Sequence, residues 1–184
     1  MKKIQYHKEI FVIEDFLSET ECDELISISE KIGFEEAKVQ TGNKEQSMIK
    51  SIRNNDRILY KNQSLADKLF EKSKSFLEQN IGLYEIKDLN EMFRFYKYSI
   101  GQRFKMHRDG SFERNHNEFS FYTFLIYLND DFEGGETEFK DLFTIKPKTG
   151  SLLIFLHPHK HEGKIILKGN KYALRSDIIY KLTQ

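Results

Sequence analysis

The residues with the clearest chemical potential are a histidine and an aspartate two positions apart, His107 and Asp109, at the end of the segment 98–109. In an extended strand the side chains alternate between two faces, so this imidazole and this carboxylate would point the same way. Both groups are common ligands for divalent transition metals. The spacing therefore predicts two metal ligands on one side of a strand.

One more histidine would complete a site that holds a metal ion by one face. A 2-His-1-carboxylate set leaves other coordination positions open and is typical of non-haem Fe(II) oxygenases. Three candidates lie late in the chain, namely His157, His159 and His161. We favour His161 because it precedes the strand-like run 163–167, whereas the other two border a proline turn. Alternation puts all three on one face, so spacing alone leaves the choice open.

The remaining reactive side chains have simpler interpretations. His7 and His116 have no partner pattern, which favours solvent-facing rings. Cys22 lies among apolar helix positions and is expected to be a core residue, not a nucleophile. As the single cysteine it cannot form an internal disulfide, which favours a reducing, cytoplasmic setting.

The composition is typical of one globular domain. The chain has 184 residues, of which 39% are hydrophobic and 32% are charged. The formal net charge is zero, which argues against a nucleic acid or a membrane surface as partner. No apolar run approaches the ~18 residues that cross a bilayer. The N-terminal residues also lack the apolar core of a signal peptide.

Two helices are predicted within residues 1–82. Ser18 and Glu21 have the spacing of a capping box, which opens the first helix. Ser64 and Asp67 repeat that spacing before a second apolar stripe. Both helices precede the strand-rich part of the chain, so they would brace a sheet from outside.

After this region the pattern changes to short strands. Alternating aromatic residues over 91–98 and a long apolar run over 119–128 read as strands, and further short runs follow at 137–139, 143–145, 152–155 and 172–180. Close spacing without intervening helices favours a sandwich or barrel. We predict an α+β, mainly β fold in a single domain over 1–184. A helical support region (1–82) would brace a jelly-roll core (91–181).

Five segments of the second half form a series: Tyr98-x-x-Gly101-Gln102-x-Phe104-x-x-His107-x-Asp109, Ile126-Tyr127-Leu128-Asn129, Glu133-Gly134-Gly135-Glu136-Thr137-x-Phe139, Pro147-x-x-Gly150-x-Leu152-x-x-Phe155, and His161-x-Gly163 leading to Gly169-x-Lys171-Tyr172. In this order they resemble the prolyl 4-hydroxylase-type branch of the 2-oxoglutarate/Fe(II) oxygenases. The resemblance implies a double-stranded β-helix (jelly roll) with Fe(II) bound by His107, Asp109 and His161. It also implies 2-oxoglutarate and O2 as cosubstrates, and ascorbate is a further candidate cofactor.

The resemblance also points to residues that would bind the cosubstrate. In the family a Lys or Arg about ten residues after the distal histidine binds the far carboxylate of 2-oxoglutarate, and Lys171 stands there. Arg175 shares its strand face by alternation, so it is the alternative anchor or a partner of Asp177. Tyr127 matches a position that donates its hydroxyl to this carboxylate, and Tyr98 matches one near the metal-chelating end. In a chain with 16 Phe and 9 Tyr, aromatic core filling is the alternative for both tyrosines.

The implied reaction is oxidative decarboxylation of 2-oxoglutarate to succinate and CO2, coupled to hydroxylation of an unactivated C–H bond. The metal and cosubstrate supply this chemistry, so no catalytic side chain is expected beyond the metal ligands. A prolyl residue of a protein or peptide is the first expected substrate. A free amino acid or other small molecule is the second, and a nucleic-acid base is the third. The alternatives from other classes are a non-catalytic jelly-roll module that binds a metal or ligand, and a cupin-like isomerase.

Loops at the mouth of the barrel would select the substrate, and we expect them at 38–56 and 110–119. Polar side chains in or beside the first loop are candidate substrate contacts, against the alternative of a solvated loop: Arg53, Asn54, Asn55 and Arg57.

Overall fold

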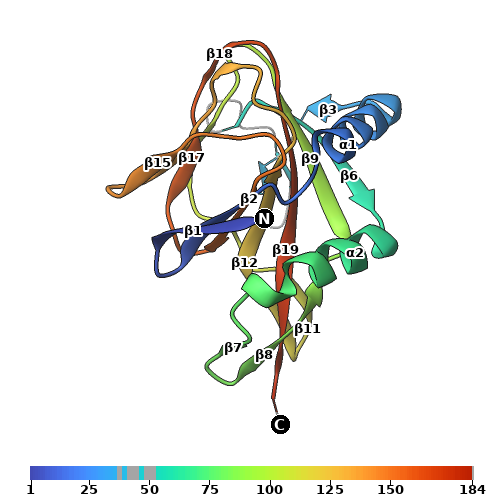
Figure 1. Cartoon of the computed structure of the whole chain (residues 1–184), viewed down its shortest axis with the longest axis vertical. Coiled ribbons are helices and arrows are strands. Elements are labelled where there is room, and N and C mark those ends of the chain that lie inside the picture. Colours follow the sequence, from blue (N-terminus) through green and yellow to red (C-terminus); the bar gives the residue numbers. More distant parts are fainter. Residues whose placement is uncertain (37–38, 41–45, 48–52, 184) are drawn as a thin grey trace.

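The computed structural model describes residues 1–36, 39–40, 46–47 and 53–183 of the chain (Figure 1). Within these residues the helices are α1 (Glu19–Ile32), α2 (Gln63–Ser73) and the 3-10 helix η1 (Lys74–Phe76). The strands are β1 (Lys2–His7), β2 (Ile10–Glu14), β3 (Glu35–Glu36), β4 (Val39–Gln40), β5 (Gln46–Ser47), β6 (Asp56–Lys61), β7 (Asn80–Ile81), β8 (Tyr84–Leu89), β9 (Met92–Tyr98), β10 (Phe104–His107), β11 (Glu113–Asn115), β12 (Glu118–Tyr127), β13 (Glu133–Gly134), β14 (Thr137–Phe139), β15 (Phe143–Ile145), β16 (Leu152–Leu156), β17 (His161–Gly163), β18 (Ile166–Lys168) and β19 (Lys171–Leu182).

Two antiparallel sheets form the framework. The major sheet has the order β1-β2-β16-β12-β19-β9-β6-β3, and the minor sheet has the order β10-β17-β14-β15. Neighbours in the major sheet come from distant parts of the sequence, since β16, β12, β19 and β9 lie side by side at its centre. This arrangement is the predicted jelly roll, built mainly from strands.

The strand β19 is the central element of the major sheet and runs along the length of the molecule (Figure 1). It pairs with β12 on one side and with β9 and then β8 on the other. With neighbours on both sides, most of its residues are buried, and Lys171 and Arg175 are among them. The strand therefore carries two cations into the interior.

The helices begin at side chains that satisfy their free N–H groups. Ser18 and Glu21 form the predicted capping box at the start of α1. The start of α2 differs from the prediction, because Asn62, not Ser64, accepts the bond from the Leu65 N–H. None of the helices in the described part of the chain is long and apolar enough to cross a membrane.

The N-terminal region contributes both helices and strands to the core. The strands β1, β2 and β6 belong to the major sheet, and α1 and α2 lie beside it (Figure 1). Buried side chains of both helices, such as Cys22, Leu25 and Leu69, join the main hydrophobic cluster with the interior face of the sheet. Cys22 is fully buried, as expected for a core residue, and desolvation raises the pKa of its thiol to about 11. The helices thus brace the sheet from one side and leave the space between the two sheets for other side chains.

Candidate functional site

His107, Asp109 and His161 come together at one end of the minor sheet. His107 on β10 and His161 on β17 are opposite each other in an antiparallel pair, and their ring centroids are 4.3 Å apart. An Asp109 carboxylate oxygen lies 3.6 Å from His107 Nε2, and the other lies 3.8 Å from His161 Nε2. One potential ligand atom from each residue lies within 4.8 Å of the others.

The local backbone differs from the prediction in one respect. The strand β10 ends at His107, so Asp109 comes from the segment that follows it, not from the strand itself. The carboxylate is therefore brought to the rings by the turn of the chain and by its contacts, and not by strand alternation. His161 is itself the first residue of β17, which begins two residues before the strand-like run that the sequence indicated.

Each ring of the pair is oriented by a backbone carbonyl two residues before it. His107 Nδ1 lies 2.8 Å from the Lys105 carbonyl oxygen, and His161 Nδ1 lies 3.0 Å from that of His159. Because a carbonyl only accepts hydrogen bonds, both Nδ1 atoms carry the proton. The unprotonated Nε2 atoms then face Asp109, which is how histidines that bind metals are commonly held.

The other two histidine candidates contact different partners. His157 is buried, with Nε2 3.6 Å from Asp177 Oδ1. His159 Nε2 lies 2.9 Å from Glu9 Oε2. Of the three histidines that spacing left open, His161 is the one whose ring reaches Asp109.

The carboxylate of Asp109 is kept ionised by its surroundings. Arg175 Nη2 lies 3.2 Å from Asp109 Oδ2, and the Thr123 hydroxyl donates a hydrogen bond of 2.5 Å to the same oxygen. Burial alone would raise the pKa of Asp109, but the charge of Arg175, followed by His161 and His107, outweighs it and holds the pKa well below its usual range. Burial lowers the pKa of His161 to about 4, although Asp109 opposes this shift. A neutral imidazole beside an ionised carboxylate is the state that binds a metal ion.

Arg175 is already engaged by two carboxylates. Besides Asp109, its Nη2 lies 2.9 Å from Asp177 Oδ1, and Asp177 also pairs with Arg94 at 2.9 Å. Burial would raise the pKa of Asp177, but Arg175 and the neighbouring His157 and Arg94 lower it to about 2. The pairing with Asp177 that the sequence offered as one role for Arg175 is present.

Lys171 lies in a different environment. Its ammonium donates to the Gly135 carbonyl at 2.6 Å and lies 5.1 Å from the ring centroid of Tyr127 and 5.6 Å from that of Tyr98. No carboxylate oxygen lies within 4 Å of it among the residues that the structure describes. The side chain is buried, and desolvation lowers the pKa of Lys171 to about 7, although the charge of Glu136 opposes this. A buried ammonium without a counter-charge is costly, and a bound anion would remove that cost.

The two predicted tyrosines surround this ammonium. Tyr127 is fully buried, and its hydroxyl lies 2.7 Å from Thr137 Oγ1. Burial raises the pKa of the Tyr127 hydroxyl and of the Tyr98 hydroxyl, so both are neutral. Gly135, which supplies the carbonyl, has φ +68°, and a Cβ there would lie 2.5 Å from Ile166 Cδ1. A glycine is therefore required where the backbone approaches Lys171.

One pocket between the two sheets unites these groups. Side chains from β9, β12 and β19 of the major sheet face side chains from the minor sheet, and the lining consists of Tyr96, Tyr98, Phe104, His107, Asp109, Thr123, Leu125, Thr137, Phe155, His161, Gly163, Lys171, Ala173 and Arg175. The walls are largely apolar, and the polar groups are concentrated in the metal-type cluster and around the two cations. This combination suits a small anionic ligand that also reaches a metal ion.

Sequence reasoning missed several residues of this pocket. Thr123 and Thr137 hold Asp109 and Tyr127 in place, and Phe104 stacks on the His107 ring with centroids 3.5 Å apart. Period-two alternation along 119–128 places Thr123 on the face of Tyr127, but a threonine in a buried strand gives no distinctive signal of its own. Arg53, by contrast, was predicted as a candidate substrate contact, and its cation packs on Tyr96 and Phe104, 4.5 and 4.6 Å from their ring centroids.

Only part of the predicted substrate loops belongs to the residues that the structure describes. Much of 38–56 lies outside the described residues. In its described part, Asn54 makes a structural contact, because its side-chain oxygen accepts a hydrogen bond of 2.8 Å from the Arg103 N–H. Asn55 contacts Arg53, and Arg57 lies within β6. The second loop, 110–119, forms the β11–β12 hairpin.

Comparisons with known proteins agree with this geometry. The family model described as "2OG-Fe(II) oxygenase superfamily" matches residues 93–176, which include the metal-type cluster and both cations. "Probable prolyl 4-hydroxylase 3" of Arabidopsis thaliana is 25% identical over 212 residues, which cover 92% of this chain and 69% of that protein. Over these residues the chain is similar to prolyl 4-hydroxylase-like 2OG-Fe(II) oxygenases. The oxygenase match explains why two histidines, a carboxylate and a buried cation share one pocket.

Solved structures show the same fold. A viral collagen prolyl hydroxylase from Paramecium Bursaria Chlorella virus-1, solved as its 2OG complex, has a TM-score of 0.69 at 24% identity, with 95% of this chain and 97% of that chain covered. A prolyl hydroxylase from Trichoplax adhaerens, in complex with a hypoxia inducible factor peptide fragment, also has a TM-score of 0.69, at 19% identity, with 95% and 83% of the chains covered. Both likenesses confirm the predicted jelly roll.

Proposed function

We propose that this oxygenase hydroxylates a prolyl residue of a protein or peptide, using Fe(II) and 2-oxoglutarate. The observation that supports the proposal best is that His107, Asp109 and His161 share a pocket with Lys171, a buried cation that has no carboxylate partner among the described residues. The relatives named as prolyl 4-hydroxylases support proline as the target. The solved Trichoplax adhaerens enzyme, whose complex contains a peptide fragment, supports a peptide as the substrate class.

In this proposal His107, Asp109 and His161 bind Fe(II). The two rings offer unprotonated Nε2 atoms because backbone carbonyls hold their Nδ1 protons. Arg175 keeps Asp109 ionised, and the Thr123 hydroxyl fixes its orientation. Once bound, Fe(II) and 2-oxoglutarate supply the activation of O2 and the oxidative decarboxylation that drives hydroxylation and leaves succinate and CO2.

Lys171 binds the distal carboxylate of 2-oxoglutarate. The Tyr127 and Thr137 hydroxyls lie beside it, so one of them can donate to the same carboxylate. The ring centroid of Tyr98 lies 5.6 Å from the ammonium, and Tyr98 lines the pocket. The apolar side chains Phe155, Leu125 and Ala173 exclude water, which strengthens the ion pair.

Arg53 is the substrate contact that we propose from the mouth of the pocket. Its side chain is 6% exposed and packs on Tyr96 and Phe104, which line the pocket. Its Nη2 is buried and has no hydrogen-bond partner among the described residues. Such an atom would gain a partner if a backbone carbonyl of a peptide reached it.

The test uses purified full-length protein loaded anaerobically with Fe(II), then given 2-oxoglutarate, ascorbate and O2. A panel of proline-containing peptides is compared with matched peptides in which alanine replaces proline, and free L-proline is a third arm. We expect succinate and a peptide product heavier by one oxygen atom, formed in equal amounts, with the proline peptides alone. Product from free L-proline alone would favour the small-molecule hydroxylase. A protein that neither binds 2-oxoglutarate nor forms succinate would favour the non-catalytic module.

A further inference from the structure

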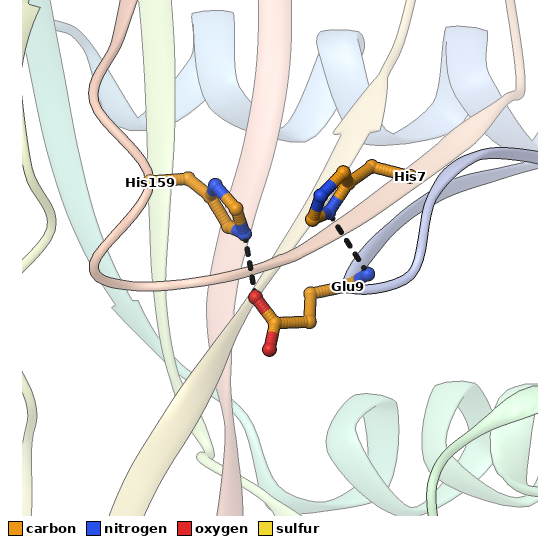
Figure 2. A group of neighbouring side chains, drawn as sticks. All are labelled: His7, Glu9 and His159. Atoms are coloured by element: carbon orange, nitrogen blue, oxygen red, sulfur yellow. Dashed lines mark hydrogen bonds and ion pairs between the residues drawn. The ribbon is translucent and has the colours of Figure 1, made fainter.

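A second group of metal-ligating side chains lies outside the pocket. His7 ends β1, Glu9 belongs to the tight turn before β2, and His159 lies between β16 and β17 (Figure 2). One potential ligand atom from each lies within 4.8 Å of the others. His7 was expected to face solvent alone, but it is partly buried and its ring centroid is 5.2 Å from that of His159.

The three side chains point toward a common centre. Figure 2 shows the two imidazoles side by side above the Glu9 carboxylate. His159 Nε2 lies 2.9 Å from Glu9 Oε2, and the side chains of these two residues are 18% and 36% exposed. Ligands around one tetrahedral zinc ion are separated by about 3.4 Å, since each bond is about 2.1 Å long. Small side-chain movements would therefore bring all three to one ion.

The protonation of His7 suits a metal ligand. Its Nδ1 accepts a hydrogen bond from the Glu9 backbone N–H at 3.3 Å, so this nitrogen carries no proton. The bond is long for an N–H···N contact and is lost at little cost. The hydrogen bond between His159 and Glu9 explains the position of two members, and the long contact with the Glu9 N–H leaves the Nδ1 lone pair of His7 available to a metal ion.

We propose that His7, Glu9 and His159 form a second metal site, for Zn²⁺ or a similar divalent transition metal. Two imidazoles and one carboxylate are a known zinc donor set, and three protein ligands leave a position open for water. The late first-row metals bind nitrogen donors more tightly than Mg²⁺, Ca²⁺ or Mn²⁺ do. The site is anchored by the pairing of β2 with β16, which places the β1–β2 turn against the segment that carries His159.

This site is separate from the pocket but adjoins it through one residue. The backbone carbonyl of His159 accepts the hydrogen bond from His161 Nδ1 at 3.0 Å, and the ring of Phe139 lies between the two histidines, 6.4 and 5.8 Å from their centroids. A metal ion bound by the His159 ring would hold the same backbone that orients His161.

The test must separate the two sites, because Zn²⁺ also binds 2-His-1-carboxylate sets. The background is therefore the full chain with His107→Ala and Asp109→Ala, which removes two of the three groups in the pocket. Zn²⁺ binding to metal-free protein is measured by equilibrium dialysis with metal analysis, and thermal unfolding is followed with and without Zn²⁺. We expect the background protein to bind one Zn²⁺ and the protein without these changes to bind two.

Glu9→Gln is the decisive variant, because the amide keeps the shape and can still hydrogen-bond to His159. On the background it should weaken Zn²⁺ binding at least about tenfold and abolish the rise in melting temperature that Zn²⁺ causes. Without Zn²⁺ its melting temperature should equal that of the background, which shows that the fold is intact. His116→Ala is the matched control, since the side chain of His116 is fully exposed. Equal Zn²⁺ affinity in the two variants, or no bound Zn²⁺ in the background, would overturn the proposal.

Discussion

The two ends of the pocket contain cations of the same strand in opposite electrostatic situations. Arg175 contacts the carboxylates of Asp109 and Asp177, so its charge is neutralised within the protein. Lys171, four residues earlier on the same face of β19, donates to one backbone carbonyl and is surrounded by aromatic rings. Arg175 has its counter-charges within the protein, whereas no carboxylate of the described residues lies within 4 Å of the Lys171 ammonium.

This difference distinguishes a cation that positions other residues, Arg175, from a cation that is available to bind a ligand, Lys171. A cation with its full set of counter-charges orients other residues, and here it fixes the carboxylate of Asp109 beside the two histidines. A buried cation without a counter-charge destabilises the folded protein and regains that free energy when an anion binds. The partners of each cation, more than its type, therefore indicate its role.

The largest expected effect is on stability. Arg175→Ala should lower the free energy of unfolding by about 3–5 kcal/mol, because Asp109 and Asp177 would stay buried without their main counter-charge. Urea denaturation measures this loss. Arg103→Ala is the control, since Arg103 is 35% exposed and pairs with Glu162, and it should cost at most about 1 kcal/mol. Equal losses would show that the buried ion pairs of Arg175 stabilise the fold no more than the exposed pair of Arg103 does.

The next largest effect is expected on the affinity for Fe(II). His161→Ala should weaken Fe(II) binding at least about a hundredfold and abolish succinate formation, because it removes one of three proposed ligands. His157→Ala should keep Fe(II) affinity, since His157 faces Asp177. Anaerobic Fe(II) titration compares the two variants. If both lose the metal alike, the third ligand must be reassigned.

The next prediction concerns the effect of a substitution at Lys171 on the affinity for 2-oxoglutarate. Lys171→Met keeps the length of the side chain and removes the charge, so 2-oxoglutarate should bind about 10–100-fold more weakly, the value of one or two charge-assisted hydrogen bonds. Fe(II) affinity should be unchanged, because Lys171 contacts none of the three proposed ligands. Two anaerobic isothermal titrations, one with 2-oxoglutarate and one with Fe(II), give the two constants. A variant with unchanged 2-oxoglutarate affinity would transfer the anchor role to another residue.

A smaller effect is expected when pH is varied, on both the stability of the ligand-free protein and its affinity for 2-oxoglutarate. Since desolvation lowers the pKa of Lys171 to about 7 from 10.5, the unfolded chain binds more protons between these values, and the stability of the ligand-free protein should rise with pH over that interval. The affinity for 2-oxoglutarate should fall instead, by about fivefold from pH 7 to pH 8, as the ammonium loses its proton. Lys171→Arg should abolish this fall, because a guanidinium stays charged. Parallel pH trends for stability and affinity would contradict the assignment.

The smallest effect is expected outside the pocket. Cys22→Ser should leave succinate formation unchanged and lower the free energy of unfolding by about 1–2 kcal/mol, because a hydroxyl replaces a buried thiol in the core. Activity and urea denaturation measure the two consequences. Loss of turnover in a folded Cys22→Ser protein would point to a thiol that takes part in the reaction.

Much of the site could be predicted from the sequence because its members lie in short, patterned segments. His107 and Asp109 are close in the chain, and Lys171 follows His161 at a fixed spacing on a strand. The jelly roll itself follows from many short strands without helices between them. The role of Lys171 came from the family resemblance, and strand alternation was the wrong reason for Asp109, because β10 ends at His107.

The rest depends on contacts between distant segments. Alternation placed Arg175 on the right face but could not show that it contacts Asp109 as well as Asp177. The grouping of His7 with His159 requires the pairing of β2 with β16, which no local pattern encodes. The start of α2 at Asn62 was missed because Ser64 offers an equally good capping pattern in the sequence.

The central position of β19 also determines the order in which the parts of the pocket unfold. From Ala173 to Arg175 its backbone pairs with β9 on one side and with β12 on the other, so the amides there should exchange with deuterium only when the whole sheet opens. The short pairs β13–β18 and β14–β15 sit at the periphery and should exchange much earlier. Heat or denaturant would therefore unfold these peripheral strand pairs first. Lys171 and Arg175 would stay in place until the final cooperative unfolding step.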